Sequence, residues 1–382
     1  MENPTNGPLP RWTVDVARAD AIAFIESRPD LSALRPTPYN AETYVADIAA
    51  NPYTDALIIF RHYIKLASDA YFSQVAGAKN VDLFMMTPSV SSPMGPGSDS
   101  EAIPITFGNL KTFLVDSSQF GFEPLLFQGI DRVYCYLPSM RGEDPDERHL
   151  NQFFHCEMEI KGTLPELKPI IEDYVRALGQ ITLALWPIVS LMCKDPEVSR
   201  RALEGLMSAR SFTTRTFDES FSLLAELDNP SEYVHETVHG RDIKSKGERY
   251  ISQVDNSPLP TWIENYDRDR VPFYQKPSPM DNSKVINADL IFPPLTDDGF
   301  GGEIVGAGQR QDNETEMLES LNRQGLSADP YRWYIDLRNK DAYTTTSGFG
   351  LGIERFIAWS LGYNSIRDVI LYPRLKNVVT LP

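Results

Sequence analysis

Apolar residues recur at helical spacing through residues 54–75, which predicts a long amphipathic helix. The positions that share this apolar face are Ala56, Ile59, Phe60, Tyr63, Ile64, Ala67, Ala70 and Tyr71. Residues 164–192 form a second helical stretch. Two shorter helices are predicted over residues 15–27 and 42–50, so residues 1–51 are expected to form a helical N-terminal extension.

Residues 153–160 alternate between two sets of side chains, as a strand with one buried face does. Phe154, Cys156, Met158 and Ile160 are expected in the core, and Phe153, His155, Glu157 and Glu159 are expected to face a cleft. Further strands are predicted over residues 81–86, 111–115, 132–137, 284–292, 302–306 and 333–337, followed by a helix over residues 351–361. Residues 195–262 are polar without a strong period, which favours a variable insert. This order predicts an α+β fold, an antiparallel β-sheet flanked by helices.

The composition is that of a folded globular protein, with 382 residues, 42% of them hydrophobic and 11% aromatic. No stretch approaches the run of about 20 apolar residues that spans a membrane. The N-terminal residues have no apolar run of the secretory type, and the three cysteines lack metal-ligand spacing. We therefore expect a cytoplasmic protein with no membrane segment. The net charge of −17 argues against an extensive nucleic-acid footprint.

Two stretches far apart in the chain combine arginines with residues suited to bind a nucleotide. The first contains Arg141, Glu143, Arg148, His149 and Phe153. The second is the run Gly348-Phe349-Gly350-Leu351-Gly352-Ile353-Glu354-Arg355. Arginine forks bind phosphate bidentately, an aromatic ring offers a stacking face, and glycines allow close backbone approach. Because phosphoryl chemistry is promoted mainly by positioning and charge, the two stretches indicate one nucleotide-handling site.

Together the two stretches resemble motifs 2 and 3 of the class II aminoacyl-tRNA synthetases, in the asparaginyl and aspartyl branch. The resemblance extends to the end of the chain, so residues 52–382 are expected to form a class II synthetase core as a catalytic domain. The predicted helix over residues 54–75 and the strand that ends at Pro88 are similar to motif 1 of this family, which implies a homodimer.

The resemblance also implies ATP and Mg²⁺ as cofactors and gives roles to individual residues. Arg141 and Arg355 would be catalytic, by stabilising charge that develops on the phosphate. The ATP-binding positions would be Arg141, Glu143, Arg148, His149, Phe153, Glu303, Gly350, Gly352 and Arg355. Glu303 and Asp289 are the candidates for Mg²⁺, which takes a few carboxylates together with substrate oxygens.

The acid substrate is assigned by the same resemblance to Gln119, Glu123, Arg310 and Arg338. Glu123 corresponds to a glutamate that receives a side-chain amide in asparaginyl enzymes. Aspartyl enzymes carry a lysine where this chain has Phe122, so an amide-containing acid is favoured.

Two positions depart from the family pattern. The family's glutamate for the substrate α-ammonium group falls near Met94, and Asp99 and Glu101 are candidates to replace it. A histidine expected before the motif 3 glycines is replaced by Thr345-Thr346-Ser347. A pocket altered in this way could accept an acid without a free α-amine.

These features predict a ligase that activates a small carboxylic acid with ATP as an acyl-adenylate and then forms an amide with ammonia or an amine. The alternatives are tRNA aminoacylation of the asparaginyl-tRNA synthetase type and a non-catalytic ATP-binding paralogue. Residues 1–51 show no strand-like alternation in place of the family's anticodon-binding β-barrel. The lack of this barrel pattern and the acidic net charge together predict that tRNA is not a partner.

A separate motif, His235-Glu236-Thr237-Val238-His239, satisfies the H-E-x-x-H pattern of zinc proteases. That chemistry needs both imidazoles one helical turn apart and a third ligand. No histidine follows at the metzincin spacing, and a carboxylate further along the chain is the alternative ligand. We expect a polar helix that carries no zinc.

Overall fold

The computed structural model describes residues 7–91, 100–237 and 239–382. Within this part of the chain, eight strands form the main sheet in the order β1-β5-β6-β13-β12-β11-β10-β7. Their bounds are β1 Lys79–Asn80, β5 Arg132–Met140, β6 Gln152–Lys161, β7 Thr213–Thr216, β10 Thr261–Glu264, β11 Asn287–Phe292, β12 Gly302–Gln309 and β13 Thr346–Gly352. Neighbours from β5 to β10 are antiparallel, whereas β1 pairs with β5 and β7 with β10 in parallel. The predicted α+β fold is confirmed.

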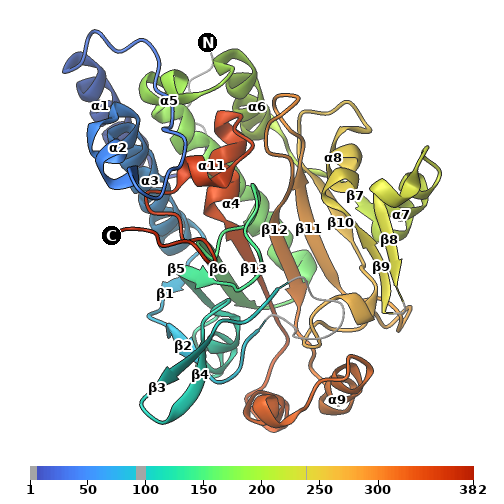
Figure 1. Ribbon diagram of the computed structural model, residues 1–382. Helices are drawn as coiled ribbons and strands as arrows, with labels where there is room; N and C mark the ends of the chain where they lie inside the picture. Colours follow the sequence, from blue (N-terminus) through green and yellow to red (C-terminus); the bar gives the residue numbers. More distant parts are fainter. Residues whose placement is uncertain (1–6, 92–99, 238) are drawn as a thin grey trace.

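Helices gather beside the strands β5, β6 and β13 (Figure 1). They are α1 Arg11–Glu26, α2 Tyr44–Ala50, α3 Pro52–Ala70, α4 Leu164–Ala184, α5 Trp186–Met192, α6 Pro196–Ser208 and α11 Ile353–Leu361. Two smaller sheets lie apart from the main one, β2 Met86–Thr87 with β3 Pro104–Phe107 and β4 Leu110–Leu114, and the hairpin β8 Val234–Thr237 with β9 Gly240–Ile243. The hairpin lies at the opposite end of the sheet from α1, near α7 Phe217–Ala225 and α8 Ser245–Gln253 (Figure 1).

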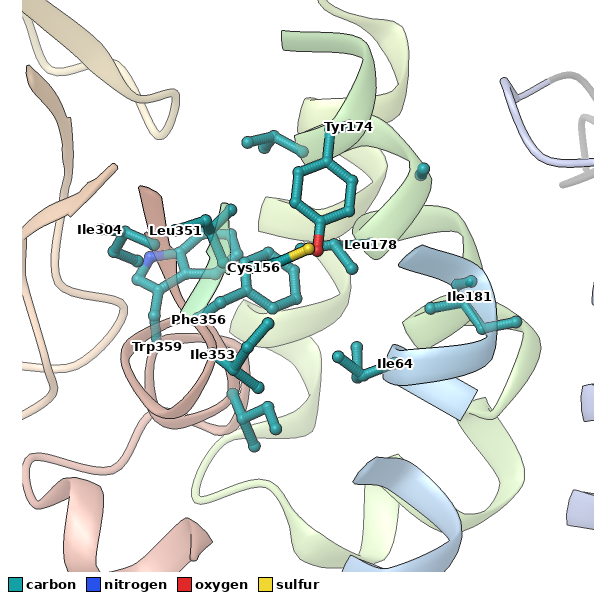
Figure 2. Packing of buried hydrophobic residues seen from close by; sticks show 14 of the residues in the cluster. Ile64, Cys156, Tyr174, Leu178, Ile181, Ile304, Leu351, Ile353, Phe356 and Trp359 are labelled. Carbon is teal, nitrogen blue, oxygen red and sulfur yellow. The ribbon is translucent and has the colours of Figure 1, made fainter. Parts of the chain in front are cut away.

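The alternation predicted for residues 153–160 is present in β6. Cys156, Met158 and Ile160 are buried in the core between the sheet and the helices. Figure 2 shows Cys156 beside Tyr174 of α4, with Leu351 of β13 and Phe356 of α11 close by. The helices therefore cover one face of the sheet and leave the other face for the polar set of β6.

Helix α3 contributes its apolar face to the same core. Ala56, Phe60, Tyr63, Ile64 and Ala67 are buried within the chain. The apolar pattern that suggested a dimer interface is thus satisfied by contacts with the chain's own helices. The homodimer stays a prediction, but this helix's amphipathicity no longer supports it.

The predicted single helical stretch over residues 164–192 is instead two helices, α4 and α5, that meet at an angle of 90°. Pro187 stands at the start of α5. A proline has no N–H and its ring clashes with the carbonyl four residues earlier, so a continuous helix cannot pass this point. Among the described residues no single helix is long and apolar enough to cross a membrane. Of the described helices, only α4 and α5 taken together have the length and the apolar composition required, and they are bent by 90° at their junction.

Two predicted strands are wrong. Residues 81–86 contain no strand of that length, because β1 ends at Asn80 and β2 begins at Met86. Residues 333–337 lie instead in helix α10 Arg332–Ile335 and a 3₁₀ turn over Asp336–Asn339. Tyr334 and Ile335 are aromatic and β-branched, but both are buried in a small aromatic cluster with Phe120 and Phe273. This packing overrides their preference for strands.

The predicted variable insert over residues 195–262 is regularly folded. It contains α6, α7, α8 and the β8–β9 hairpin, and its strands β7 and β10 extend the main sheet. Its elements are short, which explains why no long period appears in the sequence. Helix α6 packs with α4 and α11 on the covered face, whereas the part from β8 to α8 forms one wall beside the cleft face of the sheet.

An ion-pair cluster ties this wall to the core. The Asp267 carboxylate accepts from Arg241 Nε at 2.9 Å and from Lys284 Nζ at 2.7 Å. Burial alone would raise the pKa of Asp267, but these two cations outweigh it and lower the pKa to about 2.

Replacement of Asp267 by asparagine should lower the free energy of unfolding at pH 7. A carboxyl whose pKa is lower in the folded state stabilises the fold above its unfolded value of about 3.9, and this stabilisation is lost as the pH falls toward 2. With solvent screening of this partly exposed cluster, the loss should be about 1–2 kcal/mol. Urea unfolding at several pH values tests this, and a difference that persists unchanged at pH 2 would contradict it.

Candidate active site

The loop after β5 is fixed by one buried side chain. Asn151 Nδ2 donates to the backbone carbonyls of Arg141 and Glu143, both at 2.8 Å. Strand β6 follows at once and places Phe153 beside the loop, with the Arg141 guanidinium 5.3 Å from the centre of its ring. Arg141 Nε is buried and has no hydrogen-bond partner among the described residues. The arginine is thus held in place with donor capacity left for a ligand.

A cavity of about 90 Å³ brings the predicted nucleotide residues together. Its lining includes all of them: Arg141, Glu143, Arg148, His149, Phe153, Glu303, Gly350, Gly352 and Arg355. A larger cleft of about 610 Å³ adjoins it and is walled by residues of β9 and α8, such as Arg241 and Glu248. The wall from β8 to α8 therefore borders the cavity that gathers the predicted nucleotide residues.

Arg355 organises the far side of this cavity. Its Nη1 lies 3.1 Å from Glu303 Oε2, and its Nη2 donates to His149 Nε2 at 3.3 Å. His149 in turn donates from Nδ1 to Asp146 at 2.8 Å. Burial and the Arg355 charge lower the pKa of His149, so the ring is neutral at pH 7. The donors left for a ligand on this lining are therefore arginine N–H groups, those of Arg141, Arg148 and Arg355, and they suit a chain of phosphates.

Two carboxylates stand on neighbouring strands, β11 and β12. Asp289 is paired with Gly306 in the sheet, and a Cβ on Gly306 would lie 3.1 Å from Glu303 Oε1 and 3.5 Å from Asp289 Oδ1. Burial and the Glu303 charge hold the pKa of Asp289 well above its usual range. Burial also opposes ionisation of Glu303, but Arg355 outweighs it and lowers that pKa.

This donor set fits Mg²⁺, which binds one or two protein carboxylates and completes its shell with water and substrate oxygens. A cation would relieve the repulsion between the two groups. Within the described ranges no cluster of three or more His, Cys, Asp or Glu side chains is assembled for a metal. Asp289 and Glu303 would hold the ion, and its charge would help to stabilise the phosphate oxygens.

A second cavity, of about 280 Å³, shares Arg141, His155, Glu303 and Gly350 with the first. Two glutamines on its lining, Gln119 and Gln275, have buried amide atoms without a protein partner, Nε2 and Oε1 respectively. Unpaired buried donors and acceptors are rare in native proteins, so both point to a polar ligand.

Arg310 also lines this cavity, but its charge is already balanced. Its Nε and Nη2 donate to Glu159 at 2.9 and 2.8 Å, and both side chains are at most 5% exposed. Gly348 makes room for the pair, since a Cβ there would lie 1.9 Å from Glu159 Oε2. Arg310 therefore presents hydrogen-bond donors without a net positive charge.

Glu123 and Arg338, predicted to bind the acid, lie outside the lining of both cavities. Arg338 Nη2 donates to both carboxylate oxygens of Glu123 at 3.1 Å, and each side chain is 1% exposed. Thr346 completes the group by donating to Glu123 at 3.0 Å. The geometry gives this pair a role inside the protein, behind the cavity.

The segment expected to contain the α-ammonium site lies only partly within the described residues. Met94 and Asp99 lie outside the described residues. The Glu101 carboxylate lies 3.3 Å from Lys376 Nζ at the surface. Glu101 is thus engaged by the C-terminal segment.

The H-E-x-x-H segment is not helical, which corrects the prediction of a polar helix. His235 lies in β8, and His239 lies in the turn that leads to β9. Side chains four residues apart in a hairpin do not converge as they do on a helix. The pattern therefore lacks the geometry of a zinc protease.

His155 and Glu157 line the second cavity but received no role from the sequence. The alternation of β6 was the signal that could have found them, since it placed both on the cleft face. Glu157 is buried and accepts from the backbone N–H of Ser118 at 2.9 Å and from the Ser117 hydroxyl. Burial raises the pKa of Glu157, although these donors oppose the shift. Gln275 gave no signal in the sequence.

The family model for class II tRNA synthetases (D, K and N) matches residues 48–376. The chain belongs to this family. The expected branch is supported by relatives named asparagine–tRNA ligase: that of Pyrococcus abyssi is 32% identical over 265 residues, 69% of this chain and 56% of the relative. That of Streptococcus pneumoniae is 31% identical over 290 residues, 71% of this chain and 62% of the relative. The chain thus spans little more than half the length of the curated relatives it matches.

Solved structures show the same fold. Asparaginyl-tRNA synthetase from Pyrococcus horikoshii, complexed with asparaginyl-adenylate, superposes with a TM-score of 0.75 at 24% identity, over 87% of this chain and 71% of that one. The Entamoeba histolytica asparaginyl-tRNA synthetase in complex with asparaginyl-adenylate has a TM-score of 0.72 at 22% identity, over 88% and 71%. The class II synthetase core predicted from the motifs is confirmed.

The prediction that tRNA is an unlikely partner is wrong, because the relatives are named as enzymes that charge tRNA. The prediction relied on the lack of strand-like alternation in residues 1–51 and on the net charge of −17, which is a property of the whole chain. An acidic total does not exclude a local basic track for nucleic acid.

Proposed function

We propose that the protein activates asparagine, or a closely similar amino acid, with ATP as an aminoacyl-adenylate and transfers the acyl group to tRNA. The observation that carries the proposal is the pair of adjoining cavities that share Arg141, His155, Glu303 and Gly350. One has the residues expected of a nucleotide site, and the other has a polar lining. An acid and ATP bound in them would meet at the shared residues.

In the first step a carboxylate oxygen attacks the α-phosphorus of ATP and pyrophosphate leaves. Arg141 and Arg355 both line the nucleotide cavity and stabilise the charge that develops on the phosphate. The unpaired Nε of Arg141 supports this role, because a ligand would supply its missing partner. Phe153 offers its ring as a stacking face for the base.

The charge balance of the second cavity, which would hold the acid, supports a neutral side chain on the substrate. Arg310 is neutralised by Glu159, and Phe122 contributes no cation to the lining. Arg270 is paired with Asp242 at 3.0 Å, which leaves Arg141 as the one arginine on the described lining without a carboxylate partner. A second carboxylate, as in aspartate, would therefore have to compete with the phosphate for Arg141. An amide matches the unpaired Gln119 donor and Gln275 acceptor.

The acceptor is tested by offering purified protein asparagine, ATP and Mg²⁺ with total tRNA, or with ammonia in place of tRNA. We expect acid-stable aminoacyl-tRNA with asparagine and at least about tenfold less with aspartate. Amide formation from ammonia without charged tRNA would favour the amide ligase predicted from the sequence. Product in neither reaction would contradict the proposal.

A further inference from the structure

His155 occupies the junction of the two cavities and has no part in the steps described so far. It lies on β6 opposite Gly352 of β13 and belongs to the lining of both cavities. Its Cδ2 edge faces Gly350, where an added Cβ would lie 4.0 Å away. The ring of Phe153 stands edge-on to it, with 4.7 Å between ring centres. The imidazole is therefore placed where the acid would be joined to the phosphate.

The two nitrogens of this ring have different surroundings. Nδ1 lies 3.0 Å from the Ser139 hydroxyl and 3.8 Å from Glu157 Oε1. These oxygens favour the tautomer in which Nδ1 carries the proton, as a carboxylate does behind a catalytic histidine. No hydrogen bond to Nε2 exists within the described residues, so its lone pair is available to a ligand.

Fixed charges keep the ring neutral. Burial, Arg141 and Arg355 together hold the pKa of His155 well below its usual range. Arg141 after β5 and Arg355 on α11 act on the ring through their charge, and Glu157 on β6 lies 3.8 Å from Nδ1. Two further carboxylates, Glu303 on β12 and Glu354 on α11, line the first cavity together with His155. A phosphate bound by the two arginines would offset their charges. The pKa would then rise toward its ordinary value when the substrate is present.

We propose that His155 is the general base of acyl transfer, acting through Nε2 on the incoming hydroxyl. The hydroxyl oxygen forms a bond to the acyl carbon while its proton passes to Nε2. The bond from the acyl carbon to the phosphate oxygen then breaks, and AMP leaves with the electron pair. This inference rests on the proposed function, because it concerns the second step of that reaction.

The test separates the two steps in single turnovers. Enzyme-bound adenylate is formed from asparagine, ATP and Mg²⁺, and tRNA is then added. Glutamine at position 155 keeps polarity and approximate size but cannot accept a proton. In His155→Gln, transfer should slow by about a hundred-fold or more, the usual contribution of general base catalysis, so that adenylate accumulates. Adenylate formation should fall by no more than about threefold, because the arginines that promote it remain.

Three further measurements distinguish a proton acceptor from a structural residue. The wild-type transfer rate should rise with pH and level off, and this inflection should be missing in His155→Gln. Ser139→Ala, which removes the Nδ1 partner, should slow transfer by about tenfold. Exposed His62 on α3 is the matched control, and His62→Gln should leave both steps unchanged.

Transfer at the wild-type rate in His155→Gln would overturn the inference, and so would an equal fall in both steps. A pH inflection that persists in the variant would also overturn it. If the wild-type protein forms no adenylate, the proposed function fails and the inference fails with it. If adenylate forms normally and only the role of His155 is refuted, the proposed function stands.

Discussion

Replacing Arg141 with alanine should lower the rate of ATP–pyrophosphate exchange by about a hundred- to a thousand-fold, the effect of removing one donor that stabilises transition-state charge. Arg141 belongs to both cavities, so its guanidinium lies where the carboxylate and the α-phosphate would meet. Its buried Nε has no partner among the described residues, so little of the fold depends on it. The loss should therefore appear in activity and leave the urea midpoint nearly unchanged.

The matched control is Arg200→Ala. Arg200 is a half-exposed arginine on α6 that pairs with Glu204 on the same helix. This variant should exchange at close to the wild-type rate. Arg355→Ala should behave like Arg141→Ala, with an added loss at the nucleotide because its contacts with Glu303 and His149 disappear. Near-normal exchange in both active-site variants would contradict the assignment.

Replacing Glu123 with alanine should lower the free energy of unfolding by about 3–5 kcal/mol, the typical cost of leaving one partner of a buried ion pair without its counter-charge. Arg338 would remain buried at 1% exposure, with hydrogen bonds to the carbonyls of Gln311 and Tyr334 but no carboxylate. Urea unfolding measures the loss. The exposed pair on α6 gives the control, since Glu204→Ala should cost about 0–1 kcal/mol.

A double variant sharpens this test. The double variant Glu123→Met/Arg338→Met removes both charges. Its free energy of unfolding should therefore be higher than that of Glu123→Ala. The alternative, direct binding of substrate by Glu123, predicts a different outcome. In that case Glu123→Ala would unfold like the wild type and show a raised KM for the amino acid.

The grouping of the proposed nucleotide residues around one cavity could be predicted because they lie in two short motifs with fixed internal spacing. Arg141 to Phe153 and Gly348 to Arg355 are each local runs, and register between β6 and β13 brings them together. The alternation along β6 likewise separated core residues from cleft residues. Local patterns of this kind can be recognised in the sequence without knowledge of contacts between distant residues.

Features that depend on distant partners could not be predicted in this way. Glu123 and Arg338 are 215 residues apart, and nothing local marks them as a buried pair rather than a substrate contact. Tyr334 and Ile335 have the composition of a strand, yet the aromatic cluster around Phe120 places them in a helical turn. The short elements of residues 195–262 join the sheet through β7 and β10. These strands are too short to give a clear alternation of apolar and polar residues in the sequence.

The central claim is that this site forms an aminoacyl-adenylate from ATP, and ATP–pyrophosphate exchange measures that step alone. The wild-type protein should exchange label in the presence of Mg²⁺ and asparagine, and should stop when either is withheld. Arg141→Ala under the same conditions should give about the background rate. Exchange that is absent with every amino acid offered, from protein shown to be folded, would contradict the account.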